Sequence, residues 1–150
     1  MSIGAYEYGD EIKSKINLKD TYGNITNFLF DDPLFTEHAN NPSHDNSKNI
    51  KLYLNCLSLC HTVIAQYNDP KDVPPAINEG LLEDNEVEMV IPDKLIYQSS
   101  SPDELALVNA ARYFNYVFLK RDISNNIYIV ENGVEVKYEI LHIIEYTSER

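Results

Sequence analysis

Hydrophobic residues recur every three or four positions in the first half of the chain, which predicts an amphipathic helix over residues 50–61. The face expected to be buried consists of Leu52, Tyr53, Cys56, Leu57 and Cys60. Residues 62–67 follow as a predicted strand. Further upstream, Asp32 and Pro33 predict a helix start, with Asp32 as the N-cap and Pro33 as the first helical residue.

The second half of the chain is more regular and predicts one helix followed by a meander of strands. The helix runs from Pro102 to about Phe114, and its expected buried stripe is Leu107, Val108, Ala111 and Phe114. Strands are expected over 116–120, over 127–130 and from residue 134 onward, with Asn132-Gly133 as a type I′ turn. The fold class is therefore predicted to be α+β, with a twisted, mostly antiparallel sheet flanked by helices.

Alternation continues along the last segment, so that Val134, Val136, Tyr138, Ile140, His142, Ile144 and Tyr146 share one largely apolar face. On this pattern alone, Tyr146 is an aromatic residue of the core or of a sheet edge. His142 is then a hydrogen-bonded or partly exposed side chain, because no Ser, Cys or Asp partner is identifiable for acid-base or nucleophilic chemistry.

Two polar stretches separate the predicted elements. Residues 38–49 are rich in Asn, and residues 68–90 are rich in Pro and acidic side chains. Both are expected to be exposed, mobile loops. Near the N-terminus, Tyr6 and Tyr8 precede Gly9 in a short predicted strand and turn. The length of 150 residues fits a single domain, 1–150.

The formal net charge of −12 excludes several classes of partner. Nucleic acids and anionic membrane surfaces both require concentrated Lys and Arg, so neither is expected to bind. No stretch approaches the ~20 apolar residues of a membrane span, and the N-terminus lacks a signal pattern. We therefore expect a soluble cytosolic domain that makes no direct contact with the membrane.

The two cysteines, Cys56 and Cys60, lie one helical turn apart, with His61 next to Cys60. A structural zinc site normally needs four N or S ligands, and no second pair occurs at a suitable spacing. The sequence therefore predicts no metal site. It predicts instead that both cysteines pack as small hydrophobic residues in a reducing compartment.

The run from Tyr97 to Val108 joins a strand end to a helix start, with a carboxylate at the junction. Ser101 is suited to cap the helix, Pro102 to begin it, and Glu104 has the spacing of a capping box. A capping box alone needs no ligand to explain it. The other interpretation is that Glu104 belongs to a binding site.

The letters Ser101-Pro102-Asp103-Glu104 resemble the Ser-Pro-Asp-Glu motif in the nucleotide-binding domain of the type IV P-type ATPases, the phospholipid flippases. Other segments resemble the same family in the same order, and together with this motif they span nearly the whole chain from end to end. These segments are Ser2-Ile3-Gly4, Tyr8-Gly9-Asp10, Leu57 to Val63, Ala110-Ala111-Arg112 and Glu145 to Arg150.

The resemblance implies a site for ATP. In that family the glutamate of the motif faces adenine and an aromatic residue stacks on the ring, which implies these roles for Glu104 and Tyr146. Ser148 and Arg150 are implied to lie near the sugar or the phosphates. Mg²⁺ is expected to accompany ATP, mainly through domains absent here. The resemblance implies no catalytic residue in this chain, because the phosphorylated Asp would lie upstream of Met1.

The implied parent protein is an ATP-hydrolysing phospholipid translocase, with this domain on the cytoplasmic face of the membrane. Its expected partners are ATP, the phosphorylation and actuator domains of the parent, and an accessory subunit. The Lys-Gly-Ala motif of the family would follow Arg150, so the domain is expected to be C-terminally truncated relative to the family.

Two departures keep alternatives open. Tyr146 replaces the usual Phe, and Leu105 replaces a usually small residue. Together with the acidic surface, they favour a rival interpretation, in which the domain is a nucleotide-independent protein-interaction module of the same fold. A further alternative is an ATPase-like region fused to a guanylate cyclase.

Overall fold

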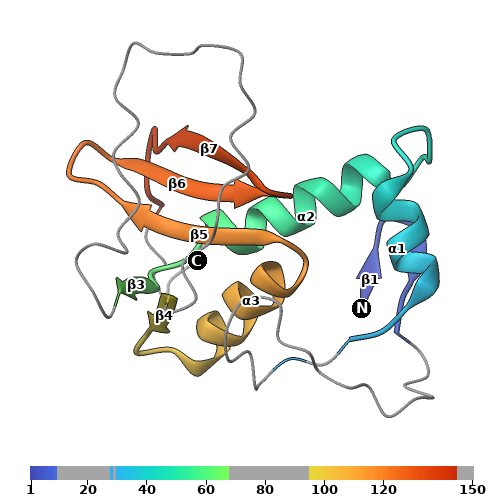
Figure 1. Cartoon of the computed structure of the whole chain (residues 1–150), viewed down its shortest axis with the longest axis horizontal. Helices are drawn as coiled ribbons and strands as arrows, with labels where there is room; N and C mark the ends of the chain where they lie inside the picture. The colour runs from blue at the N-terminus through green and yellow to red at the C-terminus, as the bar shows by residue number, and fades with distance from the viewer. Residues whose placement is uncertain (10–27, 29, 68–94, 145–150) are drawn as a thin grey trace.

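The computed structural model describes residues 1–9, 28, 30–67 and 95–144, and over these residues the fold is a mixture of helices and antiparallel sheets, as the sequence predicts (Figure 1). The helices are α1 (Pro33–Asn40), α2 (Ser47–Leu59) and α3 (Pro102–Tyr113). The strands are β1 (Ser2–Ile3), β2 (Tyr6–Glu7), β3 (Ile64–Tyr67), β4 (Leu95–Gln98), β5 (Tyr116–Arg121), β6 (Asn126–Glu131) and β7 (Val134–Glu139).

Strands β5, β6 and β7 form an antiparallel meander in that order. The turn between β6 and β7 has positive φ at both central residues, 50° at Asn132 and 91° at Gly133, which is the signature of the predicted type I′ hairpin. The alternation expected to run on to Tyr146 ends earlier, because β7 stops at Glu139. Residues 140–144 are not in a strand, and Tyr146 lies outside the described residues.

A second antiparallel pair, β3 and β4, is joined to the meander by tyrosine hydroxyl groups. The register of β5 against β6 shifts between Phe118 and Lys120, as at a β-bulge. The carbonyl groups at this shift accept hydrogen bonds from Tyr97 (2.7 Å, to Phe118) and Tyr67 (2.7 Å, to Leu119). Irregular backbone in the core is thereby satisfied by side chains of the neighbouring pair.

Two hydrophobic clusters form the core. One lies between the sheets and includes Val63, Leu95, Val108 and the inner residues of β5 and β6. The other lies beneath α1, α2 and the β1–β2 hairpin, and it includes Phe35, Ile50, Leu54, Ala111 and Tyr116. Helix α3 contributes to both clusters, Val108 to the first and Ala111 to the second, so it joins the two halves of the molecule.

The predicted buried face of the 50–61 helix is wrong at Leu52, Cys56 and Cys60, whereas Tyr53 and Leu57 are partly buried against the cluster beneath α1. Helix α2 instead buries Ile50, Leu54 and Ser58, whereas Leu52 is 69% exposed and both cysteines are exposed. The stripe at 50, 54 and 58 is as periodic as the expected one at 52, 56 and 60. Long-range contacts decide between them, because Ile50 and Leu54 pack in the cluster beneath α1. The stripe expected on α3 is corrected at one position, since Leu107 is exposed.

Helix α1 begins as predicted, with the Asp32 carboxylate accepting hydrogen bonds from the backbone N–H groups of Leu34 (2.8 Å) and Phe35 (3.3 Å). The loop expected over 38–49 is shorter in the structure, because α1 continues to Asn40 and α2 begins at Ser47. The other expected loop, 68–90, lies outside the described residues.

A buried polar network holds two residues of the Asn-rich stretch in place. The Tyr8 hydroxyl is 2.8 Å from His38 Nδ1 and accepts a hydrogen bond from Asn46 Nδ2 (2.8 Å). Asn46 also donates to the Ile3 carbonyl (2.9 Å). Tyr8, His38 and Asn46 are all buried, so their polar groups tie the β1–β2 hairpin to both helices.

Within the described residues, none of the helices is long and apolar enough to cross a membrane. Figure 1 shows α2 running from α1 and the N-terminal hairpin towards the three-stranded sheet, with α3 alongside β5.

Candidate functional site

Glu104 lies in the first turn of α3, directly after strand β4. Ser101 caps the helix as predicted, with its Oγ accepting a hydrogen bond from the Glu104 N–H (3.3 Å), and Pro102 occupies the first helical position. The return bond of a capping box does not form, because the Ser101 N–H donates to Ser99 Oγ instead (3.1 Å). The Glu104 side chain is therefore available for another partner.

That partner is Thr62, in the segment that follows α2. Glu104 Oε2 accepts a hydrogen bond from Thr62 Oγ1 (2.7 Å) and another from the Thr62 N–H (3.2 Å). Ser99 Oγ lies at 3.5 Å from the same oxygen. These bonds stabilise the ionised carboxylate and lower the pKa of Glu104, with the Thr62 hydroxyl as the largest cause. The two bonds join segments 42 residues apart in the sequence.

His61 holds the Thr62 segment in shape. The Val63 N–H donates to His61 Nδ1 (3.1 Å), so Nε2 carries the proton of the neutral ring and donates to the Ser58 carbonyl (3.0 Å). Burial lowers the pKa of His61, which keeps the ring neutral. Arg121 of β5 donates to the His61 carbonyl (2.8 Å) and anchors the turn to the sheet.

Arg112 supports the other side of this region. It is 3% exposed and donates from Nη1 to the Leu95 carbonyl at the start of β4 (3.0 Å). Its guanidinium carbon lies 5.4 Å from the centre of the Tyr97 ring, within the range of a cation–π contact. Arg112 thus fixes α3 to β4 near the end of the helix.

The arrangement leaves one carboxylate oxygen of Glu104 unused. Oε2 receives the Thr62 bonds, and among the described residues Oε1 has no hydrogen-bond partner. An oriented acceptor at the edge of a strand-to-helix junction suits a ligand that presents an N–H donor, such as an exocyclic amino group. Of the site residues expected from the sequence, Glu104 is the one that lies among the described residues.

The other expected site residues, Tyr146, Ser148 and Arg150, lie outside the described residues. Thr62 is a participant that the sequence reasoning missed, although its segment was among those singled out. Spacing could not have found it, because its contact with Glu104 depends on how α2 and α3 pack together. Leu105, the departure next to Glu104, is half-buried and packs against the cluster between the sheets.

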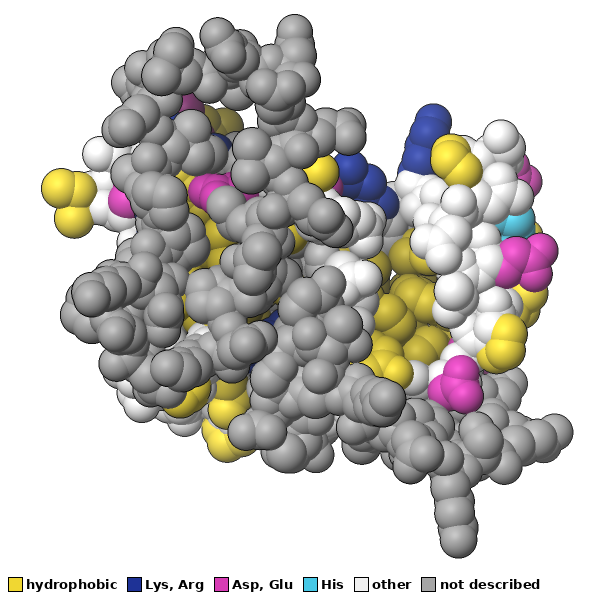
Figure 2. Space-filling view, in the orientation of Figure 1, with side chains coloured by type: hydrophobic (Ala, Val, Ile, Leu, Met, Phe, Trp, Pro, Cys, Tyr) yellow, Lys and Arg dark blue, Asp and Glu magenta, His cyan; other side chains and the backbone are white. Residues whose placement is uncertain are grey.

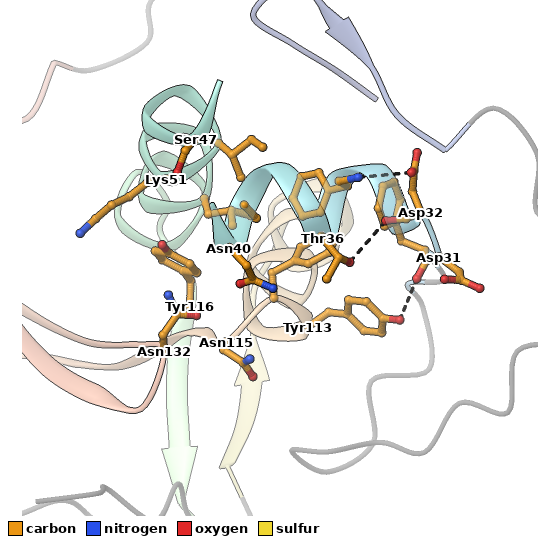
Figure 3. A pocket seen from close by; sticks show the side chains of 16 residues that line it. Asp31, Asp32, Thr36, Asn40, Ser47, Lys51, Tyr113, Asn115, Tyr116 and Asn132 are labelled. Carbon is orange, nitrogen blue, oxygen red and sulfur yellow. Dashed lines mark hydrogen bonds between the residues drawn. The ribbon is translucent and has the colours of Figure 1, made fainter. Parts of the chain in front are cut away.

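A separate pocket lies at the opposite end of α3. It has a volume of about 280 Å³ and opens between α1, α2 and the start of β5. Figure 2 shows a hollow with hydrophobic side chains on its floor in this part of the molecule. Aromatic rings line it, and its polar rim, labelled in Figure 3, comprises Asp31, Asp32, Thr36, Asn40, Ser47, Lys51, Asn115 and Asn132. None of the site residues expected from the sequence lines it.

Charged groups at this rim are already engaged. The Asp32 carboxylate caps α1 and also accepts from the Gly9 N–H (2.6 Å). Lys51 Nζ forms an ion pair with Glu131 at 3.0 Å. The rim therefore offers mainly amide and hydroxyl groups above an aromatic floor, which suits an uncharged aromatic group better than a phosphate.

Several curated proteins resemble this chain. It is 37% identical over 123 residues to the phospholipid-transporting ATPase IC of Xenopus tropicalis, a match that covers 79% of this chain and 8% of that protein. It is 36% identical over 101 residues to the human phospholipid-transporting ATPase IK, covering 67% of this chain and 6% of that protein. The phospholipid-transporting ATPase dnf1 of Schizosaccharomyces pombe is 32% identical over 117 residues, covering 73% and 6% respectively.

The matched region is therefore only a small part of each of these proteins, between 6% and 8% of their length. No protein-family model matches the chain.

Proposed function

Because this chain belongs to the type IV P-type ATPases, the family of the phospholipid-transporting ATPases, we propose that it is a nucleotide-binding module that presents ATP to a phosphorylation domain of its parent protein. The observation that carries the proposal is the geometry of Glu104, whose Oε2 is held by Thr62 while Oε1 has no hydrogen-bond donor among the residues that the structure describes. A carboxylate oxygen held in this way can accept a hydrogen bond from the amino group of adenine.

Three residues near the C-terminus complete the proposed site. Tyr146 would stack on the adenine ring, since a phenol ring offers the same π face as the Phe usual in the family. Ser148 and Arg150 would lie near the sugar and the phosphates. Mg²⁺ would accompany the phosphates and offset part of the repulsion from the chain's net charge of −12.

The chain's own contribution to phosphoryl transfer would be orientation. Held by its base, the nucleotide would extend its terminal phosphate towards an aspartate on the phosphorylation domain. The phosphate and the aspartate would then react from a fixed orientation and would not depend on a random encounter. In the parent protein this step would power phospholipid translocation, with the module on the cytoplasmic face of the membrane. The actuator domain and an accessory subunit are the other proposed partners. Fusion of an ATPase-like region to a guanylate cyclase is the alternative for the parent.

A titration of the ¹⁵N-labelled chain with Mg-ATP, followed by amide chemical shifts, tests the proposal. We expect the amides of Thr62 and Glu104 to shift at millimolar ATP or below. GTP should bind more weakly, because guanine presents a carbonyl oxygen where adenine presents an amino group. Absence of any shift at these amides, or equal shifts with ATP and GTP, would contradict adenine recognition by Glu104.

A matched pair of variants separates the role of Glu104 from net charge. Glu104→Gln should raise the Kd for ATP by about 10-fold, since it loses a charge-assisted hydrogen bond. Asp103→Asn removes the same charge from the adjacent position in the same helical turn, and it should leave the Kd nearly unchanged. Equal losses of ATP affinity in the two variants would show that Glu104 acts only through its negative charge.

The pocket in Figure 3 favours a second candidate function, a protein-interaction module that does not bind nucleotide. Its volume of about 280 Å³ suits one aromatic side chain of a partner protein, with the rim amides bonding to the partner's backbone. N-acetyltryptophanamide is a suitable probe. On this candidate it should shift the amides of Phe114 and Tyr116, while ATP shifts nothing near Glu104. Ala39→Phe, which fills the pocket, should abolish the response.

A further inference from the structure

The two cysteines of α2 lie on its solvent face. Both are exposed and free of disulfide bonds, and the neighbouring Leu52 on the same stripe is 69% exposed. Cys56 and Cys60 are four residues apart, and the Cys60 N–H donates to the Cys56 carbonyl (2.9 Å), so the helical turn between them is intact. Residues four apart on a helix lie one above the other, which brings the side chains together on one face.

The two thiol groups lie on adjacent turns of the same exposed face of α2. Sulfur atoms at this spacing can bind one ion between them without a change of backbone. The pair therefore has the geometry of a bidentate sulfur site.

The surroundings exclude a third ligand from the described part of the chain. No group of three or more His, Cys, Asp or Glu residues there could hold a metal ion. His61 follows Cys60 directly, but both of its ring nitrogens are engaged, Nδ1 with the Val63 N–H and Nε2 with the Ser58 carbonyl. The site therefore offers two sulfur ligands and no imidazole.

This ligand set discriminates between metals. Zinc prefers four ligands, or three and a water, and two thiolates meet neither requirement. Soft thiolate ligands select Cu(I), a d¹⁰ ion for which two sulfur ligands in a line suffice. The partial negative charge at the C-terminus of a helix, where Cys60 lies, also favours a bound cation over a bare thiolate.

We propose that Cys56 and Cys60 form a two-thiolate binding site for a soft monovalent metal ion of the Cu(I) type. On binding, each thiol releases its proton to solvent and forms one metal–sulfur bond, and the ion stays in the +1 state, so no oxidant or reductant is consumed. The site stands apart from nucleotide binding and does not rest on it. Because Thr62 follows Cys60 by two residues, the bound ion would lie next to the segment that holds Glu104.

The test uses the 150-residue chain under anaerobic conditions, with Cu(I) supplied against a competing chromogenic chelator. We expect one ion per chain and protection of both thiols from iodoacetamide. Cys56→Ser and Cys60→Ser should each weaken binding by about 100-fold or more, because the second sulfur binds at high effective concentration. Two ions per chain, or single variants that retain the native affinity, would overturn the proposal.

A rescue experiment tests the spacing. The double variant Leu52→Cys with Cys60→Ser moves the pair one turn towards the N-terminus of α2, still four residues apart on the exposed stripe. It should regain most of the affinity that Cys60→Ser loses. Failure to regain it, with circular dichroism showing the same helix content as the native chain, would mean that the spacing is not what binds the ion.

Discussion

Thr62 and Glu104 are joined by two hydrogen bonds to one carboxylate oxygen, from the Thr62 hydroxyl (2.7 Å) and from its backbone N–H (3.2 Å). The contact links the end of α2 to the start of α3. It orients the carboxylate before any ligand arrives, so that less conformational freedom is lost on binding. Thr62 is thus a positioning residue for the proposed adenine contact.

Removing the Thr62 hydroxyl should weaken nucleotide binding without removing Glu104. Thr62→Val keeps the backbone bond and the side-chain shape but loses the 2.7 Å bond. We expect the Kd for Mg-ATP, measured by calorimetry, to rise roughly 3- to 10-fold, the worth of one hydrogen bond. Thr62→Ser retains the hydroxyl and serves as the control. If Thr62→Val and Thr62→Ser bind alike, the hydroxyl does not position the carboxylate.

The free energy of unfolding should fall when the pH is lowered through the range in which histidine titrates. Burial lowers the pKa of His61 in the folded state, so below the ordinary value of about 6.5 the unfolded chain binds a proton that the folded chain does not. His61 therefore contributes stability that is present above that pH. The loss begins below it and is complete below the lowered pKa.

Urea unfolding between pH 5 and pH 8 measures this effect. Titration of His61 can account for at most about 1.4 kcal/mol per pH unit. His61→Gln should flatten the pH profile, whereas His142→Asn, at an exposed position, should not change its slope. Identical profiles for the native chain and His61→Gln would show that the buried ring does not carry the pH dependence.

Loss of the Tyr8 hydroxyl should destabilise the N-terminal half of the molecule. Tyr8→Phe keeps the ring in its cluster but removes the partner of His38 Nδ1 and of Asn46 Nδ2. Leaving buried polar groups unpaired costs about 1–3 kcal/mol, which chemical unfolding can measure. Tyr6→Phe is the control, because within the described residues its hydroxyl has no hydrogen-bond partner. Equal effects of the two substitutions on the free energy of unfolding would show that the buried network does not stabilise the fold.

Arg112 should stabilise the fold through its packing as much as through its charge. Arg112→Ala leaves a cavity and an unpaired Leu95 carbonyl, and it should lower the free energy of unfolding by about 2–4 kcal/mol. Arg112→Met keeps most of the side-chain volume, so its loss should be about 1 kcal/mol or less. If the Met variant is as unstable as the Ala variant, the charge and its contact with Tyr97 outweigh the packing.

Local signals were the part of the fold that the sequence could predict. The caps at Asp32 and Ser101 and the Asn132-Gly133 turn each depend on residues within three positions of one another, and the structure confirms all three. Such signals act through backbone geometry that neighbours alone determine.

The face of α2 could not be predicted in the same way. Two stripes of the helix have the same period, one through Leu52 and one through Ile50, and both carry apolar residues. The structure buries Ile50, Leu54 and Ser58, because Ile50 and Leu54 pack in the cluster beneath α1. Tertiary packing decides which of two equal periodicities faces inward.

The candidate site likewise combines a local signal, which the sequence shows, with a long-range contact, which it does not. Glu104 was predicted from a motif within one turn of helix, whereas its bond to Thr62 spans 42 residues and depends on the packing of two helices. The proposed roles of Glu104, Tyr146, Ser148 and Arg150 stay predictions.

Helix α3 carries Glu104 in its first turn and Tyr113, which lines the pocket, at its last residue. Its 12 residues make a rod of about 18 Å, and Val108 and Ala111 pack it into both core clusters. A helix this short moves as one rigid body, so a displacement at one end is passed on to the other. A ligand that shifts Tyr113 would therefore alter the separation of Glu104 from Thr62.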